Sequence, residues 1–321
     1  MTRLQVLVER DILTAEEHRM LSQRFPAVEF ALAADEAAWL ALAPAAAVIF
    51  AKNIPPDALA RAGRLRWLQA GTAGVDGLLR RGLAGRDVLL TNARGAHGTP
   101  IAEQILAMAL CFATRMHWLL RARPEDRAVH NRVIGEKFEL AGQTILVLGL
   151  GDIGGTLAAK AAALGMRVLG VRRSGTAHPA CERVYRPAAL LEALPGADHV
   201  ALCLPLTDET RRLISAPELR AMRPTAYLYN VGRGASIDGA ALRQALREGW
   251  IAGAGLDCVE PADTPAPDDP LWTMENVILG RHTSGSSPYN SGRIAAIFAD
   301  NLTRFLAGQP LLNVVDRRRG Y

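Results

Sequence analysis

Short apolar runs alternate with amphipathic stretches along most of the chain. In the first hundred residues, the apolar runs predict strands at residues 4–8, 47–50, 67–69 and 88–90. Between the first two runs, the apolar positions of residues 14–24 repeat with the period of a helix. Because strands that alternate with helices are typical of a parallel sheet covered by helices, we predict an α/β fold.

A second series of apolar runs predicts a second sheet. These runs lie at residues 144–148, 167–171, 200–204, 226–230, 253–257 and 277–279. Six strands make up a complete dinucleotide-binding sheet. The sequence therefore predicts a domain of the Rossmann type in the middle of the chain.

Two long helices are predicted on either side of this second sheet. Each begins at a capping residue followed by proline, Thr99-Pro100 in one and Ser287-Pro288 in the other, and the second helix ends near Gly308. We infer that the chain leaves one domain, builds the second and returns to the first. The expected segments are 1–97, 98–287 and 288–321, with the active site in the cleft between the two domains.

The bulk composition narrows the class of protein. The chain has 321 residues, of which 50% are hydrophobic and 21% are charged, enough for two globular domains. No apolar run reaches the roughly 18 residues that a membrane span requires, and the first residues lack the layout of a signal peptide. The four cysteines are scattered without a CxxC pair, so we expect free thiols, no metal site and a cytoplasmic protein.

The charge pattern favours a small anionic ligand over a nucleic acid. The net charge is +5, but the basic residues are spread along the chain apart from Arg317, Arg318 and Arg319. A nucleic-acid-binding surface more often shows a basic stripe with interleaved aromatic residues. A mild positive balance instead suits an anionic substrate or a phosphate-bearing cofactor.

A glycine motif gives the sharpest local signal. An apolar strand runs into Gly149, Gly151 and Gly154, with Asp152 and Ile153 between the last two, and then into an alanine-rich helix. Gly149 permits a tight turn, Gly151 lets the backbone approach a pyrophosphate, and Gly154 lets helix and strand pack closely. Free N–H groups at the start of the helix then face the phosphates. These five residues are predicted to bind a dinucleotide.

The end of the next predicted strand indicates which dinucleotide. In NAD-binding domains an acidic residue at this place binds the ribose 2′-hydroxyl, whereas this chain has Arg172, Arg173 and Ser174. Two guanidinium groups and a hydroxyl suit a 2′-phosphate. We therefore predict that NADP(H) is favoured over NAD(H).

Further motifs follow one another in a set order along the chain. They are Trp67-Leu68-Gln69, Ala73-Gly74-Val75-Asp76, Thr91-Asn92-Ala93-Arg94-Gly95, Thr99-Pro100-Ile101-Ala102-Glu103, Leu204-Pro205-Leu206-Thr207, Asn230-Val231-Gly232-Arg233-Gly234, Gly253-Ala254-Gly255-Leu256-Asp257, Asn276-Val277-Ile278-Leu279 and Asn313-Val314-Val315-Asp316. With them the chain resembles the D-isomer specific 2-hydroxyacid dehydrogenase family, including its glyoxylate and hydroxypyruvate reductases, over nearly its whole length. The resemblance implies a flavodoxin-like substrate domain, a Rossmann NAD(P)-binding domain, and a homodimer formed largely through the cofactor domains.

The resemblance assigns catalytic roles to two residues that follow predicted strands. Arg233, flanked by Gly232 and Gly234, corresponds to the family arginine that binds the carboxylate and the carbonyl oxygen of the substrate. His282 corresponds to the acid/base histidine. Histidine titrates near neutral pH, which suits proton transfer in both directions.

The resemblance also assigns residues that bind substrate and cofactor. The substrate carboxylate is expected to bind backbone N–H groups of one loop, at Ala73, Gly74 and Val75. Further cofactor contacts are expected at Leu204, Pro205, Thr210, Val231, Gly232 and Asp257. The last of these corresponds to the family aspartate that binds the nicotinamide carboxamide.

The chain departs from the family pattern beside the histidine. The glutamate that normally partners the histidine corresponds to Ala262, and Glu260 corresponds to a position without a catalytic role. One inserted residue before Trp272 would place Asp263 at the partner position, where a carboxylate orients the imidazole and favours its protonated form. We assign Asp263 as the partner, with Glu260 or no partner as the alternatives. Arg281 replaces a usual proline and adds a positive charge near the histidine or the substrate.

Together these features predict an NADP(H)-dependent reductase of a small 2-keto acid, such as glyoxylate or hydroxypyruvate, that forms the D-2-hydroxy acid. His282 would protonate the substrate oxygen and Arg233 would polarise the carbonyl. The alternative is a dinucleotide-sensing binding protein without turnover, which the irregular loop and Arg281 motivate. A formate-type dehydrogenase is disfavoured because its histidine pairs with glutamine, and no glutamine lies between Asp257 and Trp272.

Overall fold

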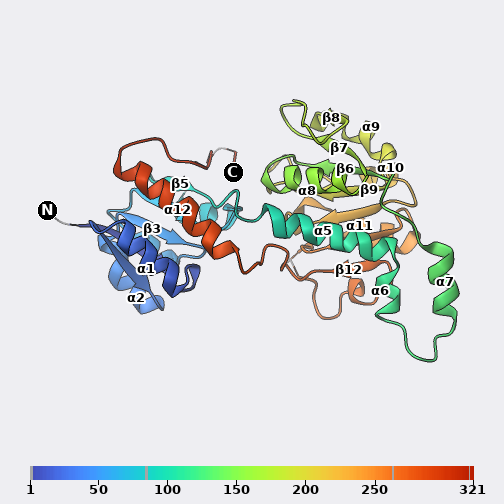
Figure 1. Ribbon diagram of the computed structural model, residues 1–321, viewed down its shortest axis with the longest axis horizontal. Coiled ribbons are helices and arrows are strands. Elements are labelled where there is room, and N and C mark those ends of the chain that lie inside the picture. The colour runs from blue at the N-terminus through green and yellow to red at the C-terminus, as the bar shows by residue number, and fades with distance from the viewer. Residues whose placement is uncertain (1–2, 84–85, 262–263, 318) are drawn as a thin grey trace. The chain divides into compact units, whose positions relative to one another are not determined.

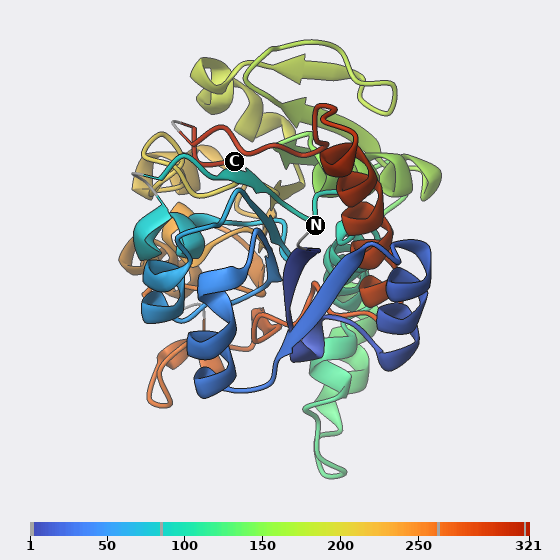
Figure 2. The same ribbon diagram turned by 90° about the vertical axis from the view of Figure 1, so that its left-hand side faces the viewer.

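The computed structural model describes residues 3–83, 86–261, 264–317 and 319–321 and divides the chain into two compact units. Unit 1 combines residues 1–97 with residues 287–321, and unit 2 comprises residues 98–286. In each unit, helices cover both faces of a parallel sheet (Figures 1 and 2). The predicted α/β class, with two parallel sheets covered by helices, is confirmed.

Within its described residues, unit 1 contains one sheet of five parallel strands in the order β2-β1-β3-β4-β5. The strands are β1 (Leu4–Glu9), β2 (Val28–Ala33), β3 (Val48–Ala51), β4 (Trp67–Ala70) and β5 (Leu89–Thr91). The helices are α1 (Ala15–Arg24), α2 (Glu36–Leu42), α3 (Pro56–Arg61), α4 (Asp76–Leu78) and α12 (Asn290–Leu306). This strand order is that of flavodoxin-like sheets.

Both faces of the unit 1 sheet are buried. Side chains alternate along a strand, so Val6 and Phe50 enter one apolar core with α1 and α12, while Leu7 and Ile49 enter the other with α2 and α3. A strand buried on both faces shows a continuous apolar run, which is why β1 and β3 can be recognised in the sequence.

The segment that returns from unit 2 completes the core of unit 1. Helix α12 lies beside α1, although more than 250 residues separate them in the chain (Figures 1 and 2). Phe298 of α12 stacks on Phe50, with 4.3 Å between ring centroids, and on Trp67 at 5.4 Å. Asn301 donates a hydrogen bond of 3.0 Å to the side chain of Gln69. The final segment is therefore part of the fold of unit 1.

In the part of unit 2 that the structure describes, seven parallel strands form a sheet in the order β12-β11-β10-β9-β6-β7-β8. The strands are β6 (Thr144–Leu148), β7 (Arg167–Val171), β8 (Arg183–Tyr185), β9 (His199–Leu202), β10 (Tyr227–Asn230), β11 (Gly253–Leu256) and β12 (Val277–Leu279). The helices are α5 (Gly98–Ala113), α6 (Met116–Leu119), α7 (Ala128–Glu136), α8 (Asp152–Ala163), α9 (Leu190–Ala193), α10 (Ala216–Ala221) and α11 (Gly239–Glu248). The strand order reverses between β6 and β9, the place where doubly wound sheets bind ligands at the carboxyl ends of their strands.

Two strands and two helix starts differ from the sequence prediction. Helix α5 begins at Gly98, before the predicted capping residue Thr99. Strands β2 and β8 are edge strands with several exposed or half-exposed side chains, so neither shows the apolar run of a buried strand. Helix α12 begins at Asn290 instead of Pro288, because a turn closed by the hydrogen bond from Asn290 N to Ser287 O, at 3.1 Å, comes first.

Helices α6 and α7 extend from the end of α5 and away from the sheet of unit 2 (Figure 1). Arg121 ties this segment to the unit by donating to the carbonyl oxygens of Met274 and Val277, at 3.1 and 3.0 Å. A membrane-spanning helix would need more length and apolarity than any helix in the described residues has.

Candidate active site

The carboxyl ends of the unit 2 strands are joined beyond the sheet itself. Backbone hydrogen bonds of 2.8 to 2.9 Å run from Gly149 N to Val171 O, from Cys203 N to Leu148 O, from Asp257 N to Asn230 O and from Gly280 N to Leu256 O. These bonds hold the turns after the strands against one another. Most of the predicted site residues of unit 2 lie in these turns.

The glycine motif has the backbone geometry that its sequence predicts. Gly149 has a φ of 94°, in the region that favours glycine, and a Cβ there would lie 2.7 Å from Cys203 O. A Cβ on Gly154 would lie 1.8 Å from Gly149 O, so only glycine lets α8 approach β6 this closely. At Gly151, by contrast, a Cβ would meet no atom within 4 Å.

The start of α8 fits a dinucleotide pyrophosphate. Gly151 is the N-cap of this twelve-residue helix and makes no side-chain capping hydrogen bond, so the positive end of the helix dipole lies at this turn. A side chain at Gly151 would occupy open space in front of this helix end. Asp152 and Ile153 lie in the first turn, and Thr156 donates to Asp152 O at 2.8 Å.

The turn after β7 gathers cations and hydroxyl groups. Arg172 and Arg173 follow the strand, and the hydroxyls of Ser174 and Thr176 lie 2.9 Å apart. Arg186 packs on the same turn, because a Cβ on Gly175 would lie 2.9 Å from Arg186 Cγ. Sequence reasoning missed Arg186, which comes from the segment after β8.

Arg172 and Arg186 differ in their ion pairing from two other arginines around β7 and β8. Arg167 pairs with Glu182 at 2.9 Å and Arg183 pairs with Glu192 at 3.0 Å. Within the described residues, Arg172 and Arg186 have no carboxylate within ion-pair distance. Their charge remains available for a ligand anion.

The loop after β9 is held by its own side chains. Thr210 donates to Pro205 O at 2.6 Å and accepts a hydrogen bond of 2.8 Å from Thr207 N. The hydroxyl of Thr210 thus fixes the shape of the loop that begins at Leu204. Leu204 O also lies close to the next turn, 2.8 Å from where a Cβ on Gly232 would be.

Arg233 sits in a turn that Asn230 organises. The side-chain amide of Asn230 donates to Arg233 O and Cys258 O at 3.0 and 3.1 Å, and its oxygen accepts from Gly232 N at 3.1 Å. Gly234 is required here, since a Cβ would lie 2.1 Å from Val259 O. Asn230 is fully buried and was not among the predicted site residues, although a polar residue at the end of an apolar strand is a usable signal.

His282 follows β12 in an unusual backbone conformation. Arg281 and His282 have φ values of 56° and 57°, both in the left-handed region that residues with side chains rarely adopt. His282 N donates to Asp257 O at 2.7 Å. The Asp257 carboxylate accepts from Thr283 N at 2.9 Å and from the backbone N–H and hydroxyl of Ser284.

These contacts connect the turns of the two predicted catalytic residues. Asn230 links the Arg233 turn to Cys258, and the neighbouring Asp257 links β11 to the His282 turn. The three turns follow the adjacent strands β10, β11 and β12. Unit 2 therefore holds both residues on one hydrogen-bonded edge.

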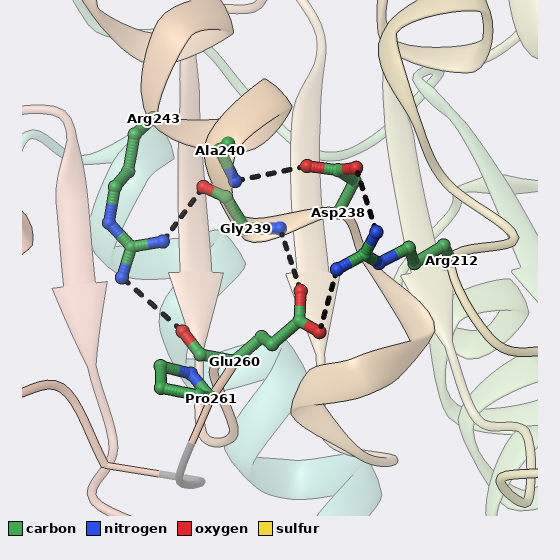
Figure 3. A pocket seen from close by; sticks show the side chains of 7 residues that line it. All are labelled: Arg212, Asp238, Gly239, Ala240, Arg243, Glu260 and Pro261. Carbon is green, nitrogen blue, oxygen red and sulfur yellow. Dashed lines mark hydrogen bonds and ion pairs between the residues drawn. The ribbon is translucent and has the colours of Figure 1, made fainter.

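The predicted partner of His282, Asp263, lies outside the described residues, as does Ala262. Glu260, the alternative partner, is engaged elsewhere: its carboxylate accepts from Gly239 N at 3.2 Å and from Arg212 at 3.4 Å (Figure 3). Arg243 lines the same pocket and donates to Gly239 O at 2.7 Å (Figure 3). These contacts tie Glu260 to the start of α11.

Arg281 directs its guanidinium group over the indole ring of Trp272, 5.0 Å from the ring centroid. The contact is a cation–π interaction that places the positive charge of Arg281 against Trp272. Arg243 also forms an ion pair with Asp269, and the hydrogen bonds from Arg243 hold the pKa of Asp269 below its ordinary value. Two arginines thus brace the segment between β11 and β12.

The predicted substrate loop lies in unit 1, directly after β4. The hydroxyl of Thr72 donates to Gly74 O at 2.8 Å and the amide of Asn92 donates to Ala73 O at 2.9 Å. With these carbonyls occupied, the backbone N–H groups of Ala73, Gly74 and Val75 make no hydrogen bond to other described residues. They are suitable donors for a carboxylate.

The four cysteines carry free thiols, and burial raises the pKa values of three of them. None of the four, all of which are described, forms a disulfide bond. Burial raises the pKa of the Cys203 thiol to about 12 and also raises the pKa values of Cys111 and Cys181. In the described part of the chain, no three His, Cys, Asp or Glu side chains are grouped as metal ligands.

Comparisons with known proteins agree with this geometry. The family model described as "D-isomer specific 2-hydroxyacid dehydrogenase, NAD binding domain" matches residues 106–284. A glyoxylate reductase from Korarchaeum cryptofilum is 33% identical over 269 residues, which cover 82% of this chain and 80% of the relative.

Two solved structures have the same fold throughout. A D-isomer specific 2-hydroxyacid dehydrogenase from Xanthobacter autotrophicus Py2, in complex with NADPH and MES, has a TM-score of 0.84 and 28% identity over 100% of both chains. An NADPH-dependent glyoxylate/hydroxypyruvate reductase from Sinorhizobium meliloti, in complex with NADP and sulfate, has a TM-score of 0.83 and 26% identity over 99% of this chain and 100% of the other. The resemblance seen in the sequence motifs is thereby confirmed: the chain belongs to the D-isomer specific 2-hydroxyacid dehydrogenase family and is an NAD(P)-dependent oxidoreductase.

Proposed function

We propose that the protein is an NADPH-dependent reductase that converts a small 2-keto acid, of the size of glyoxylate or hydroxypyruvate, to the D-2-hydroxy acid. The observation that carries the proposal is the set of linked turns after β10, β11 and β12, which holds Arg233 and His282 on the same edge of the dinucleotide-binding unit. The relatives named as glyoxylate and hydroxypyruvate reductases support the substrate class.

Reduction of a keto acid requires a hydride, a proton and a means of polarising the carbonyl. The bound cofactor supplies the hydride to the keto carbon. His282 donates the proton to the carbonyl oxygen and becomes neutral imidazole. Arg233 draws negative charge toward that oxygen and offers a planar pair of donors to the substrate carboxylate.

The substrate carboxylate would be held by unit 1. The N–H groups of Ala73, Gly74 and Val75 have no acceptor among the described residues, and Thr72 and Asn92 hold the loop through its carbonyl groups. A loop built from small residues leaves room for a small acid. We propose that this loop selects glyoxylate-sized substrates.

The preference for NADPH rests on the turn after β7. Arg172 and Arg186 are cations without a carboxylate partner among the described residues, and Ser174 supplies a hydroxyl. No acidic residue occupies the end of β7, where it would repel a 2′-phosphate and bind a ribose hydroxyl instead. The two similar structures contain NADPH and NADP, which agrees with this proposal.

The decisive experiment measures NADPH and NADH oxidation with a panel of 2-keto acids. We expect turnover with small keto acids and a higher kcat/KM with NADPH. Arg233→Lys keeps the charge but loses the two-point grip, so kcat/KM should fall at least about a hundredfold while NADPH affinity stays nearly unchanged. Arg223→Lys, at an arginine paired with Asp198, is the control.

Two outcomes would contradict the proposal. Tight NADPH binding without oxidation by any keto acid would indicate a dinucleotide-sensing protein instead. Near-normal turnover of the Arg233→Lys variant would remove Arg233 from the mechanism.

We also propose a homodimer formed through unit 2. Helices α5, α6 and α7, together with the residue that caps the end of α6, expose large apolar side chains, namely Leu110, Met116, Leu119, Leu120 and Ile134. Leu120 is 77% exposed and Ile134 is 64% exposed, which is unfavourable unless a partner covers them. Light scattering should give the mass of a dimer, and Leu120→Glu should weaken it; a monomeric wild type would overturn the proposal.

A further inference from the structure

Asp257 is among the most buried carboxylates of unit 2. Both of its carboxylate oxygens and its backbone oxygen accept hydrogen bonds from the segment after β12. Only 1% of the residue is exposed. One carboxylate oxygen accepts from Thr283 N at 2.9 Å, and the other accepts from Ser284 N at 3.1 Å and from the Ser284 hydroxyl. Its backbone oxygen accepts from His282 N at 2.7 Å.

The turn that these bonds hold is not one that the chain adopts by preference. Arg281 and His282 are consecutive left-handed residues with side chains, a conformation that needs support from its surroundings. Gly280 lets the turn approach Asp257, since a Cβ there would lie 2.4 Å from Asp257 Oδ1. Without the carboxylate, three donors of the turn would lose their acceptor.

We propose that Asp257 is a positioning residue for His282: by gathering the N–H groups of residues 283 and 284, it fixes the left-handed turn that aims the imidazole. This inference rests on the proposed role of His282 in proton transfer. It adds to the expected role as ligand of the nicotinamide carboxamide, because a carboxylate oxygen that accepts from the protein can accept a further hydrogen bond.

The test uses Ser284→Ala and Asp257→Asn in the full-length enzyme. Ser284→Ala removes one donor to the carboxylate, and Asp257→Asn replaces one acceptor oxygen by a donor of the same size. Ser286→Ala is the matched control, because Ser286 is an exposed serine of the same segment whose hydroxyl bonds to no described residue.

A mispositioned acid/base group lowers kcat with little effect on ligand binding. We expect kcat to fall about tenfold in Ser284→Ala and about a hundredfold in Asp257→Asn, while the Kd for NADPH changes by less than about twofold in Ser284→Ala. Amide hydrogen exchange at residues 282–284 should become faster in both variants and stay unchanged in Ser286→Ala.

Other results would overturn the proposal. Unchanged kcat and exchange in both variants would remove the positioning role, and so would a raised Kd for NADPH at normal kcat, which would identify a carboxamide ligand. If Asp257→Asn does not fold, Ser284→Ala alone decides. The activity of His282→Gln separates the two proposals, because wild-type turnover in that variant would defeat the proposed function while the exchange data still report on the turn.

Discussion

The side-chain amide of Asn230 donates a hydrogen bond to the backbone oxygen of Arg233, 3.0 Å away. The same amide donates to Cys258 O at 3.1 Å, so one buried side chain joins the turns after β10 and β11. The position of the Arg233 guanidinium group thus depends on a residue that is fully buried behind it.

Asn230→Ala should therefore lower kcat/KM by more than its loss of folding stability explains. Loss of the amide leaves buried groups unpaired, which should lower the free energy of unfolding by about 1–3 kcal/mol. We expect kcat/KM for the keto acid to fall at least about tenfold with an unchanged Kd for NADPH, because only the Arg233 turn is displaced. Asn276→Ala, which removes a hydrogen bond to Leu246 O, should affect stability without this kinetic change.

The arginines around the β7 turn give a prediction about cofactor choice. Arg172→Ala and Arg186→Ala should each raise the KM for NADPH by roughly tenfold and leave the KM for NADH within about twofold, because only NADPH carries the 2′-phosphate. Arg183→Ala is the control, since Arg183 pairs with Glu192. An Arg186→Ala enzyme with unaltered preference would exclude Arg186 from the phosphate site, whereas a wild type that prefers NADH would refute the assignment of the whole turn.

The partner of His282 can be identified from the pH dependence of reduction. If Asp263 favours the protonated imidazole, Asp263→Asn should shift the high-pH limb of kcat/KM to lower pH by about one unit. Glu260→Gln should leave the profile in place, because the Glu260 carboxylate is bound to Gly239 N and Arg212. A shift in Glu260→Gln alone would reverse the assignment, and no shift in either variant would mean that the histidine acts without a carboxylate partner.

A buried histidine far from the proposed chemistry should make stability depend on pH. His199 Nε2 donates to Gln143 Oε1 at 2.6 Å, and Nδ1 of the neutral ring accepts from Tyr229 Oη at 2.9 Å. Burial lowers the pKa of His199 from 6.5 to about 4. The unfolded chain therefore binds a proton between these values that the folded chain excludes. Stability is complete above about pH 6.5 and is lost as the pH falls toward 4, by about 3 kcal/mol in full.

Urea denaturation at several pH values measures this effect. His199→Gln, which cannot titrate, should be less stable at neutral pH but should lose less stability between pH 6.5 and pH 4. Equal slopes for the two proteins would show that His199 does not cause the acid sensitivity.

The parts of the site that the sequence predicts are those defined by consecutive residues. Gly149 and Gly154 act within one strand–turn–helix segment, so their spacing alone gives the geometry that the structure shows. Arg186 could not be predicted in this way. It meets Gly175 only because a short, half-exposed edge strand, β8, turns the chain back beside β7.

Asp257 illustrates a different limit. Its motif indicates a functional residue, but its partners Thr283 and Ser284 lie in the turn after β12. The spacing of residues in the sequence does not show which groups of two neighbouring turns will form hydrogen bonds. The same holds for Glu260, whose contacts with the start of α11 depend on how β10 and β11 lie side by side.

The discontinuous composition of unit 1 has a consequence for biosynthesis. Strands β1 to β5 are synthesised first. The apolar face that carries Phe50 and Trp67 is covered by Phe298 of α12, which is synthesised more than 200 residues later. Unit 2 is contiguous and can fold while synthesis continues, since domains generally fold as units during translation. Until α12 has been synthesised, one apolar face of the sheet in the first segment stays uncovered. During this interval the chain is most prone to aggregation and to chaperone binding.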